Sequence, residues 1–162
     1  MAKKREESGQ MRFVEITKDN WEAAIKLRPK RTQYRHLRGD VALHSLAKCY
    51  VMPGRYVPFL IEDDGRAVGC FRLRDYGRGV NLVAFFIDRQ YQGRGLGRKA
   101  VRHFIAWVRE HCPKAQEIEI WVGPENAAAR SLYESLGFAY TGQVSATGNL
   151  YMELRLVGQR MA

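Results

Sequence analysis

The sequence predicts an α/β protein, an α+β arrangement in which a mixed β-sheet carries helices on its faces. Segments with strand periodicity alternate with amphipathic helical segments in the order β-α-α-β-β-β-α-β-α-β-β. One strand segment, residues 80–88, is almost wholly apolar, which is typical of a strand buried on both faces. A chain of 162 residues is long enough to bury the core of one domain.

The first half of the chain contributes elements whose ends are marked by turn-forming residues. In chain order, a strand, two helices and two strands are expected over residues 12–16, 17–27, 41–51, 56–62 and 67–76. Pro29 ends the first helix, and Asp40 is a candidate N-cap for the second. The Asp64-Gly65 dipeptide separates the two later strands and favours a tight β-hairpin.

The second half alternates strands and helices and then closes with a hairpin. In chain order, a strand, a helix, a strand, a helix and two strands are expected over residues 80–88, 96–112, 117–122, 126–136, 138–145 and 150–156. Pro113 ends the long helix, because proline cannot continue the helical hydrogen bonding. Gly137 is suited to cap the C-terminus of the last helix.

Residues 11–157 are expected to form a single domain, with a disordered tail over residues 1–10 and a C-terminal tail over residues 158–162. The N-terminus is charged and lacks the apolar segment of a secretory signal, and no apolar run approaches the roughly 20 residues of a membrane span. The three cysteines lack metal-ligand spacing, so we expect reduced thiols, no bound metal and a cytoplasmic location. They are Cys49, Cys70 and Cys112.

The formal net charge of +10 indicates a polyanionic or phosphorylated partner. Nucleic acid, an acidic membrane surface and a phosphorylated cofactor all fit the charge alone. Residues 26–38 form a connector rich in Lys and Arg, and Tyr34 is its only aromatic residue. Because single-strand binders use several stacking aromatics and no standard nucleic-acid motif is present, nucleic acid is an unlikely partner.

A glycine-rich stretch, residues 89–100, lies between the apolar strand and the long helix. Backbone N–H groups at a helix N-terminus have no partner inside the helix, and glycines let them approach a ligand closely. Such a segment is typical of a phosphate cradle. The glycines at positions 93, 95 and 97 alternate, so they fit neither the dinucleotide-binding fingerprint nor a Walker A loop. A glycine-rich turn with solvated arginines is the alternative.

Two motifs resemble the signatures of the GCN5-related N-acetyltransferase (GNAT) family. "QGRGLG", residues 92–97, fits the pyrophosphate motif Q/R-x-x-G-x-G/A of that family. "NAAARSLYESLGF", residues 126–138, is similar to its second signature. The predicted element order is also that of the family, over residues 12–156. Within the family, the chain looks most similar to bacterial spermidine/spermine acetyltransferases.

The resemblance implies a GNAT fold whose central strands splay apart to hold acetyl-CoA. The pantetheine arm would pair with the backbone of Phe86 and Ile87, and Asn126 would cap its helix or bind the same arm. The pyrophosphate would be held by the loop and helix start that contain Gln92, Gly93, Arg94, Gly95, Leu96, Gly97 and Arg98. No metal is implied.

The resemblance also implies catalytic roles. Tyr133 occupies the position of a family tyrosine that protonates the leaving thiolate as general acid. A backbone N–H near Phe86 or Ile87 would stabilise the charge that develops on the thioester oxygen in a tetrahedral intermediate. Some relatives carry a glutamate base where this sequence has Trp121. Glu119 lies on the same face of that strand, so Glu119 is the candidate base, and a solvated carboxylate is the alternative.

The implied reaction is acetyl transfer to the primary amine of a small molecule. Several carboxylates would be needed to hold a polyamine, but the connector has no acid before Asp40. An acceptor that also bears carboxylate or phosphate, such as an amino acid derivative, is therefore kept beside a polyamine. Acetylation of a protein N-terminus or lysine is the alternative function, and a non-catalytic acyl-CoA or nucleic-acid binding module is the remote one. A homodimer is one expected assembly.

Overall fold

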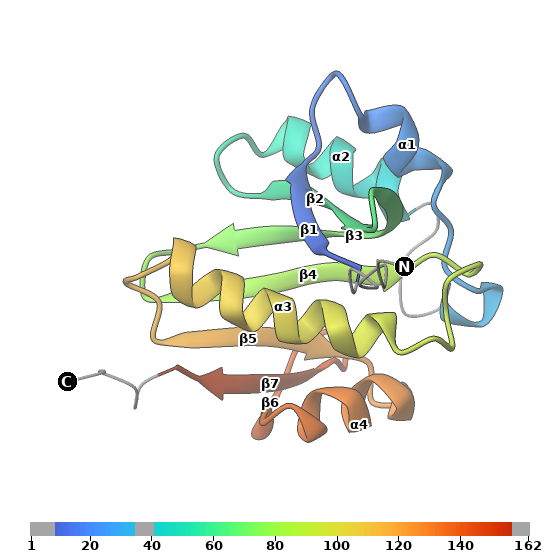
Figure 1. Ribbon diagram of the computed structural model, residues 1–162. Coiled ribbons are helices and arrows are strands. Elements are labelled where there is room, and N and C mark those ends of the chain that lie inside the picture. The colour runs from blue at the N-terminus through green and yellow to red at the C-terminus, as the bar shows by residue number, and fades with distance from the viewer. Residues whose placement is uncertain (1–8, 35–40, 157–162) are drawn as a thin grey trace, which may run out of the picture.

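The computed structural model describes residues 9–34 and 41–156, which adopt the predicted order of strands and helices (Figure 1). The strands are β1 Met11–Glu15, β2 Val57–Asp63, β3 Arg66–Asp75, β4 Gly79–Ile87, β5 Glu117–Val122, β6 Ala139–Val144 and β7 Leu150–Arg155. The helices are α1 Trp21–Lys26, the short 3₁₀ helix η1 Arg31–Gln33, α2 Val41–Val51, α3 Leu96–His111 and α4 Ala127–Ser135. The Asp40 cap, the C-terminal tail and most of the N-terminal tail lie outside the described residues.

All the strands belong to one seven-stranded sheet with the order β1-β2-β3-β4-β5-β7-β6. Neighbouring strands pair antiparallel except β4 and β5, which are parallel. The hairpin turn between β2 and β3 forms at Asp64 and Gly65, which have φ angles of 52° and 72°. Two consecutive positive φ angles are those of a type I′ turn, so the mixed sheet and its predicted hairpin are confirmed.

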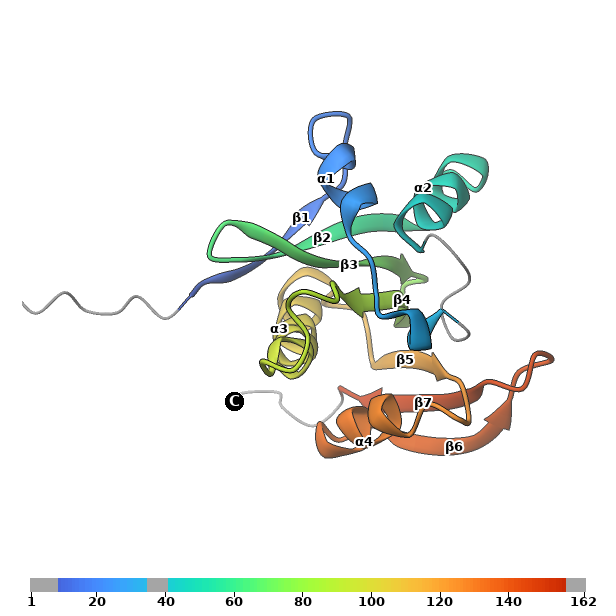
Figure 2. The same cartoon turned by 90° about the vertical axis from the view of Figure 1, so that its right-hand side faces the viewer.

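Helices cover both faces of the sheet and divide the core into two clusters (Figures 1 and 2). On one face, α3 contributes apolar side chains such as Phe104 and Val108, and α4 contributes Tyr133. On the other face, Ala24 of α1 and Ala42 of α2 pack with residues of β2, β3 and β4, including Phe86. The sheet therefore separates the layer of α3 and α4 from the layer of α1 and α2.

The parallel contact between β4 and β5 is short. Gly79, Val80 and Asn81 of β4 pair with the three residues of β5 from Glu117 to Glu119, and pairing between the two strands stops there. The remaining six residues of β4 lie beyond this paired region, and four of them, Leu82, Val83, Phe86 and Ile87, pair with β3. The splay of the central strands that the family resemblance implied is therefore present.

A β-bulge interrupts β4 in its splayed part. Phe86 pairs with Cys70 and Val83 pairs with Arg72, so two β4 residues oppose one β3 residue between these pairs. Ala84, one of the two, has a φ of 52°, which is in the left-handed region that alanine rarely adopts. A bulge bends its strand and increases the local twist. The bulge therefore lies in the part of β4 that no longer pairs with β5.

Gly69 lets β3 approach the backbone of β4 closely beside this bulge. A Cβ atom at Gly69 would overlap the carbonyl oxygen of Phe86, which is a backbone atom that cannot rotate away. We expect Gly69→Ala to lower the free energy of unfolding by roughly 1–3 kcal/mol, as overpacking does. Thermal and denaturant unfolding of the purified variant would measure the loss.

Gly97→Ala is the matched control for stability, because its Cβ would find the nearest atom, Leu132 Cδ2, at 3.9 Å. Gly97 lies in the first turn of α3, and alanine has the higher helix propensity. The control should therefore unfold at or above the temperature of the unchanged chain. Equal stability of Gly69→Ala and the unchanged chain would contradict the close approach.

Candidate active site

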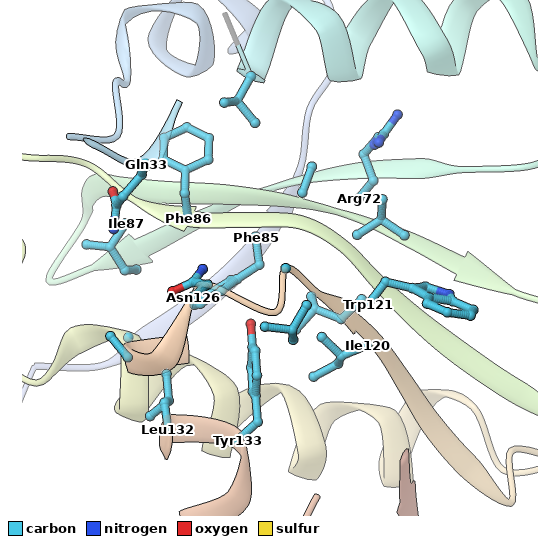
Figure 3. A pocket seen from close by; sticks show the side chains of 18 of the residues that line it. Gln33, Arg72, Phe85, Phe86, Ile87, Ile120, Trp121, Asn126, Leu132 and Tyr133 are labelled. Atoms are coloured by element: carbon cyan, nitrogen blue, oxygen red, sulfur yellow. The ribbon is translucent and has the colours of Figure 1, made fainter. Parts of the chain in front are cut away.

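A cleft of about 900 Å³ opens where β4 and β5 separate. Its walls come from both helical layers, because residues of α2 line it together with residues of α3 and α4. Figure 3 shows Gln33 and Ile87 toward one end of the cleft and Arg72 and Trp121 toward the other, with Tyr133 between them. The cleft therefore has two ends, each built by different elements.

The glycine-rich loop forms the first end. Gly93 and Gly95 have φ angles of 78° and 74°, and Gly95 is the residue that immediately precedes α3. A Cβ at either position would meet no protein atom within 4 Å. Because both glycines line the cleft, such a Cβ would occupy space in which a ligand can approach the backbone. The loop fits the pyrophosphate of a coenzyme, whose negative charge is also favoured at a helix N-terminus.

Side-chain hydrogen bonds hold this loop in place. Gln92 Nε2 donates to the carbonyl oxygen of Ile87 at 2.7 Å and to Gln33 Oε1 at 2.8 Å. Asp88, which is 6% exposed, accepts from the backbone N–H groups of Arg28 at 2.7 Å and Gln90 at 2.9 Å. Sequence analysis missed Gln33 and Asp88, since their partners lie about 60 residues away in the chain.

Asn126 and Tyr133 enter the cleft from α4. Asn126 Oδ1 accepts from the backbone N–H of Ala129 at 3.2 Å, so it caps the N-terminus of the helix while its side chain lines the cleft. Tyr133 is 6% exposed, and its hydroxyl points into the space between the splayed strands (Figure 3). Burial raises the pKa of Tyr133, so the phenol stays protonated at neutral pH and can donate a proton or hydrogen bond.

Most of the candidate cofactor residues from the sequence lie together around the cleft. Its lining includes Phe86, Ile87, Gln92, Gly93, Gly95, Leu96, Gly97, Arg98, Asn126 and Tyr133. Arg94 is not among the lining residues, and its guanidinium instead lies 5.8 Å from the ring centroid of Tyr91. The described basic residues of the connector, Lys26, Arg28, Lys30 and Arg31, do not line the cleft either.

Glu119, the candidate base, lies at the last position of β5 that pairs with β4, opposite Asn81. Its carboxylate accepts hydrogen bonds from the hydroxyl of Tyr76 and, at 3.4 Å, from Asn81 Nδ2. Burial raises the pKa of both Tyr76 and Tyr151. The hydrogen bond to the Glu119 carboxylate and its negative charge raise the pKa of both further. Glu119 does not line the cleft, but Asn81 does, so the carboxylate lies one hydrogen bond away from it.

The second end of the cleft is built by residues that sequence analysis did not single out. Arg72 lies there beside Trp121, which stands where some relatives carry a glutamate (Figure 3). The other polar lining residues that were not singled out are His44, Lys48, Tyr56, Arg74, Asn81 and Asn149. Trp121 is 40% exposed, and its ring centroid lies 4.9 Å from that of Tyr151. Apolar and basic residues alternate near the end of β3, and this pattern does not show whether a basic side chain faces solvent or a cleft.

A family model described as "Acetyltransferase (GNAT) family" matches residues 13–138, which is most of the chain and includes both motifs. The chain belongs to the GNAT family. Because enzymes of this family use acetyl-CoA, it is an acetyl-CoA-dependent N-acetyltransferase. The predicted family, enzyme class and cofactor are therefore confirmed.

Individual relatives agree with this assignment. The GNAT chain is 29% identical over 146 residues to the spermine/spermidine N(1)-acetyltransferase of Bacillus subtilis (strain 168), covering 85% of this chain and 93% of the relative. It is 33% identical over 86 residues to the [ribosomal protein bS18]-alanine N-acetyltransferase of Escherichia coli (strain K12), covering 52% and 55%. The solved spermidine N-acetyltransferase of Vibrio cholerae, in complex with CoA and spermine, has a TM-score of 0.70 at 17% identity over 90% of this chain and 95% of that chain.

Two further properties concern the part of the chain that the structure describes. None of the helices in residues 9–34 and 41–156 has the length and apolar character that crossing a bilayer requires. The same residues contain no group of three or more His, Cys, Asp or Glu side chains arranged to hold a metal ion.

The cradle at Gly95 predicts a specific loss of cofactor binding in this GNAT enzyme. In Gly95→Ala, the new Cβ projects into the cleft and strains a backbone with a positive φ. We expect the affinity for coenzyme A to fall by roughly tenfold or more, since one tenfold step corresponds to about 1.4 kcal/mol. Isothermal titration with coenzyme A would measure the change.

Gly65→Ala provides the matched control. Gly65 has a nearly equal φ of 72° and equally open space around a Cβ, but it lies in the β2–β3 turn and does not line the cleft. Both variants should lose similar stability, and only the variant at Gly95 should lose coenzyme affinity. Parallel losses of affinity in the two variants would show that backbone strain alone, rather than the cradle, is responsible.

Proposed function

We propose that the protein transfers the acetyl group of acetyl-CoA to the primary amine of a small molecule by direct attack of the amine. The observation that carries the proposal is the protonated Tyr133 hydroxyl in the middle of the cleft, between the glycine loop and the open second end. A cofactor entering from the loop and an amine entering from the other end would meet beside this hydroxyl. Acetyl-CoA supplies the acetyl group as a thioester.

The cofactor would be held mainly by the backbone. N–H groups from Gln92 to Gly97 would bind its pyrophosphate, and Arg98, whose Nη1 donates to Ser135 Oγ at 2.6 Å, would add positive charge. The part of β4 that does not pair with β5 offers its backbone edge near Phe86 and Ile87 to the pantetheine amides. One of these N–H groups would also stabilise negative charge developing on the thioester oxygen.

The chemistry needs one proton to be delivered and one to be removed. A new bond forms between the amine nitrogen and the acetyl carbon, and the bond between that carbon and sulfur breaks. We propose that Tyr133 donates a proton to the departing sulfur, because its phenol is held neutral in the cleft. The proton that the attacking amine loses passes to a base, so the products are an N-acetylated amine and coenzyme A as a thiol.

Replacement of Tyr133 by phenylalanine tests this role. We expect kcat to fall by roughly 100-fold or more, the lower part of the range for general acid catalysis, with a much smaller change in coenzyme affinity. Thiol release from acetyl-CoA and isothermal titration would measure the two effects. Tyr140→Phe is the control, because Tyr140 is 49% exposed and does not line the cleft. A wild-type kcat in the Tyr133 variant would remove Tyr133 from the mechanism.

Glu119 is the proposed base, acting through a water molecule. Its hydrogen bond to Asn81, which lines the cleft, supports this position one step from the acceptor. Glu119→Gln should lower kcat/KM, because a side-chain amide cannot take up the proton that the attacking amine loses. Glu117→Gln is the control, on the same strand and the same face but away from the cleft. An unchanged kcat/KM for Glu119→Gln would leave the carboxylate with a structural role.

Acetylation of a protein or peptide amine is the second candidate function. The similarity to the [ribosomal protein bS18]-alanine N-acetyltransferase supports this function, although the similar region covers only about half of each chain. Comparing the acetylation of a peptide array with that of a panel of small amines separates the two functions. A peptide preference would exclude the small-molecule proposal.

The named acceptors of two relatives, spermine and spermidine, suggest a polyamine as one possible acceptor class. The charge of the cleft does not support it, because Lys48, Arg72 and Arg74 line the cleft and no Asp or Glu is found among the described lining residues. A polycation beside these groups would be repelled in a confined space. A small amine without several positive charges fits the cleft better.

Compartment and assembly are further proposals. Cys49 and Cys112 are free thiols, and Cys112 is buried, which supports a reducing compartment such as the cytoplasm. Homodimerisation stays a prediction that light scattering of the purified protein would test.

A further inference from the structure

Arg72 is a buried cation without a hydrogen-bonding partner on two of its nitrogens. The residue is 5% exposed, and its Nε and Nη1 atoms are buried and make no hydrogen bond. Its guanidinium lies 5.0 Å from the ring centroid of Tyr56, a cation–π contact that satisfies no N–H group. Buried charges in proteins are normally paired and hydrogen-bonded, so an unpaired guanidinium needs an explanation.

Among the residues that the structure describes, none supplies a countercharge to Arg72. The groups that interact with it electrostatically are Cys49, Tyr56 and Cys70, and none of them is a carboxylate. Burial raises the pKa of Cys49, which keeps that thiol neutral. Arginine remains protonated in proteins, so the positive charge of Arg72 persists inside the cleft.

Arg72 lies where an acceptor would bind. It lines the cleft on the α2 side of the sheet and pairs with Val83, in the part of β4 that has parted from β5. Figure 3 shows its side chain rising from β3 toward α2, at the end of the cleft that also holds Trp121. Lys48 of α2 and Arg74, two residues further along β3, also line the cleft.

We propose that the acceptor carries a carboxylate as well as the amine, and that Arg72 binds this carboxylate, with Lys48 adding charge. The proposal rests on the acetyl transfer proposed above and names the class of its substrate as small amino acids. A guanidinium presents N–H donors in a fork that matches both oxygens of a carboxylate. Binding of the carboxylate would give hydrogen-bonding partners to Nε and Nη1 of Arg72 and leave the amine free to turn toward Tyr133.

Pairs of acceptors, each an amino acid and the amine that remains when its carboxylate is removed, test the proposal directly. Thiol release from acetyl-CoA is measured with tyrosine and tyramine, lysine and cadaverine, and ornithine and putrescine, and also with spermidine and O-phosphoethanolamine. We expect kcat/KM to be roughly 10- to 100-fold higher for the carboxylated member of each active pair, as hydrogen bonds to a charged group imply. A preference for the decarboxylated amines or spermidine would overturn the proposal, and so would a preference for O-phosphoethanolamine.

Arg72→Met then links the preference to this side chain. The ratio of kcat/KM within each active pair should fall to near one, and Arg72→Lys should restore part of it. Arg66→Met is the matched control, on the same strand but exposed and away from the cleft, and it should keep the full ratio. A full ratio in Arg72→Met would overturn the assignment of Arg72.

Thermal unfolding distinguishes a binding role from a structural one. Replacing an unpaired buried charge with an apolar side chain of similar size is often neutral or stabilising, so Arg72→Met should unfold at or above the wild-type Tm. A large fall in Tm would mean that Arg72 supports the fold and would overturn the proposal.

The acceptor panel also separates this inference from the proposed function. If neither member of any pair nor spermidine is acetylated, the proposed small-molecule function fails. If only the acceptors without a carboxylate are acetylated, the carboxylate inference alone fails.

Discussion

The short parallel contact between β4 and β5 is the constraint on which the rest of the site depends. Pairing stops after Asn81 and Glu119, so the strands beyond present backbone groups to a cleft instead of to each other. Buried N–H and C=O groups need hydrogen-bonding partners, which a bound extended ligand can supply. The bulge at Ala84 bends β4 in this region. The glycine loop follows β4, and the helix that carries Tyr133 follows β5, so both motifs converge on the same opening.

Support for the cleft comes from contacts between segments far apart in the chain. Gln33 of η1 accepts from Gln92 in the glycine loop, and Asp88 at the end of β4 accepts from the backbone of Arg28. These bonds connect the segment between α1 and α2 directly to the cofactor loop. Side chains that are locked by such bonds hold their neighbours in productive geometry. The segment between α1 and α2 and the glycine loop are therefore parts of one hydrogen-bonded framework.

Both ends of the cleft are positive, but the charge has a different source at each end. At the loop it comes from backbone N–H groups at the start of α3 and from Arg98, and it complements a diphosphate. At the other end it comes from Arg72, with Lys48 and Arg74 also in the lining, which contains no described carboxylate. A shared fold does not fix the acceptor, because acceptor choice depends on side chains that relatives can exchange without changing the scaffold.

The sequence by itself determined the elements, their order and the glycine loop, because hydrophobic periodicity, turn residues and helix caps act over a few neighbouring positions. Gly95 before α3 and Asn126 as the N-cap of α4 are such local features. Only the tertiary structure decided the burial of Arg72, the hydrogen bond between Gln33 and Gln92, and the hydrogen bond that Tyr76 donates to Glu119. These depend on strand register and on which layers meet across the sheet, and long-range packing sets both.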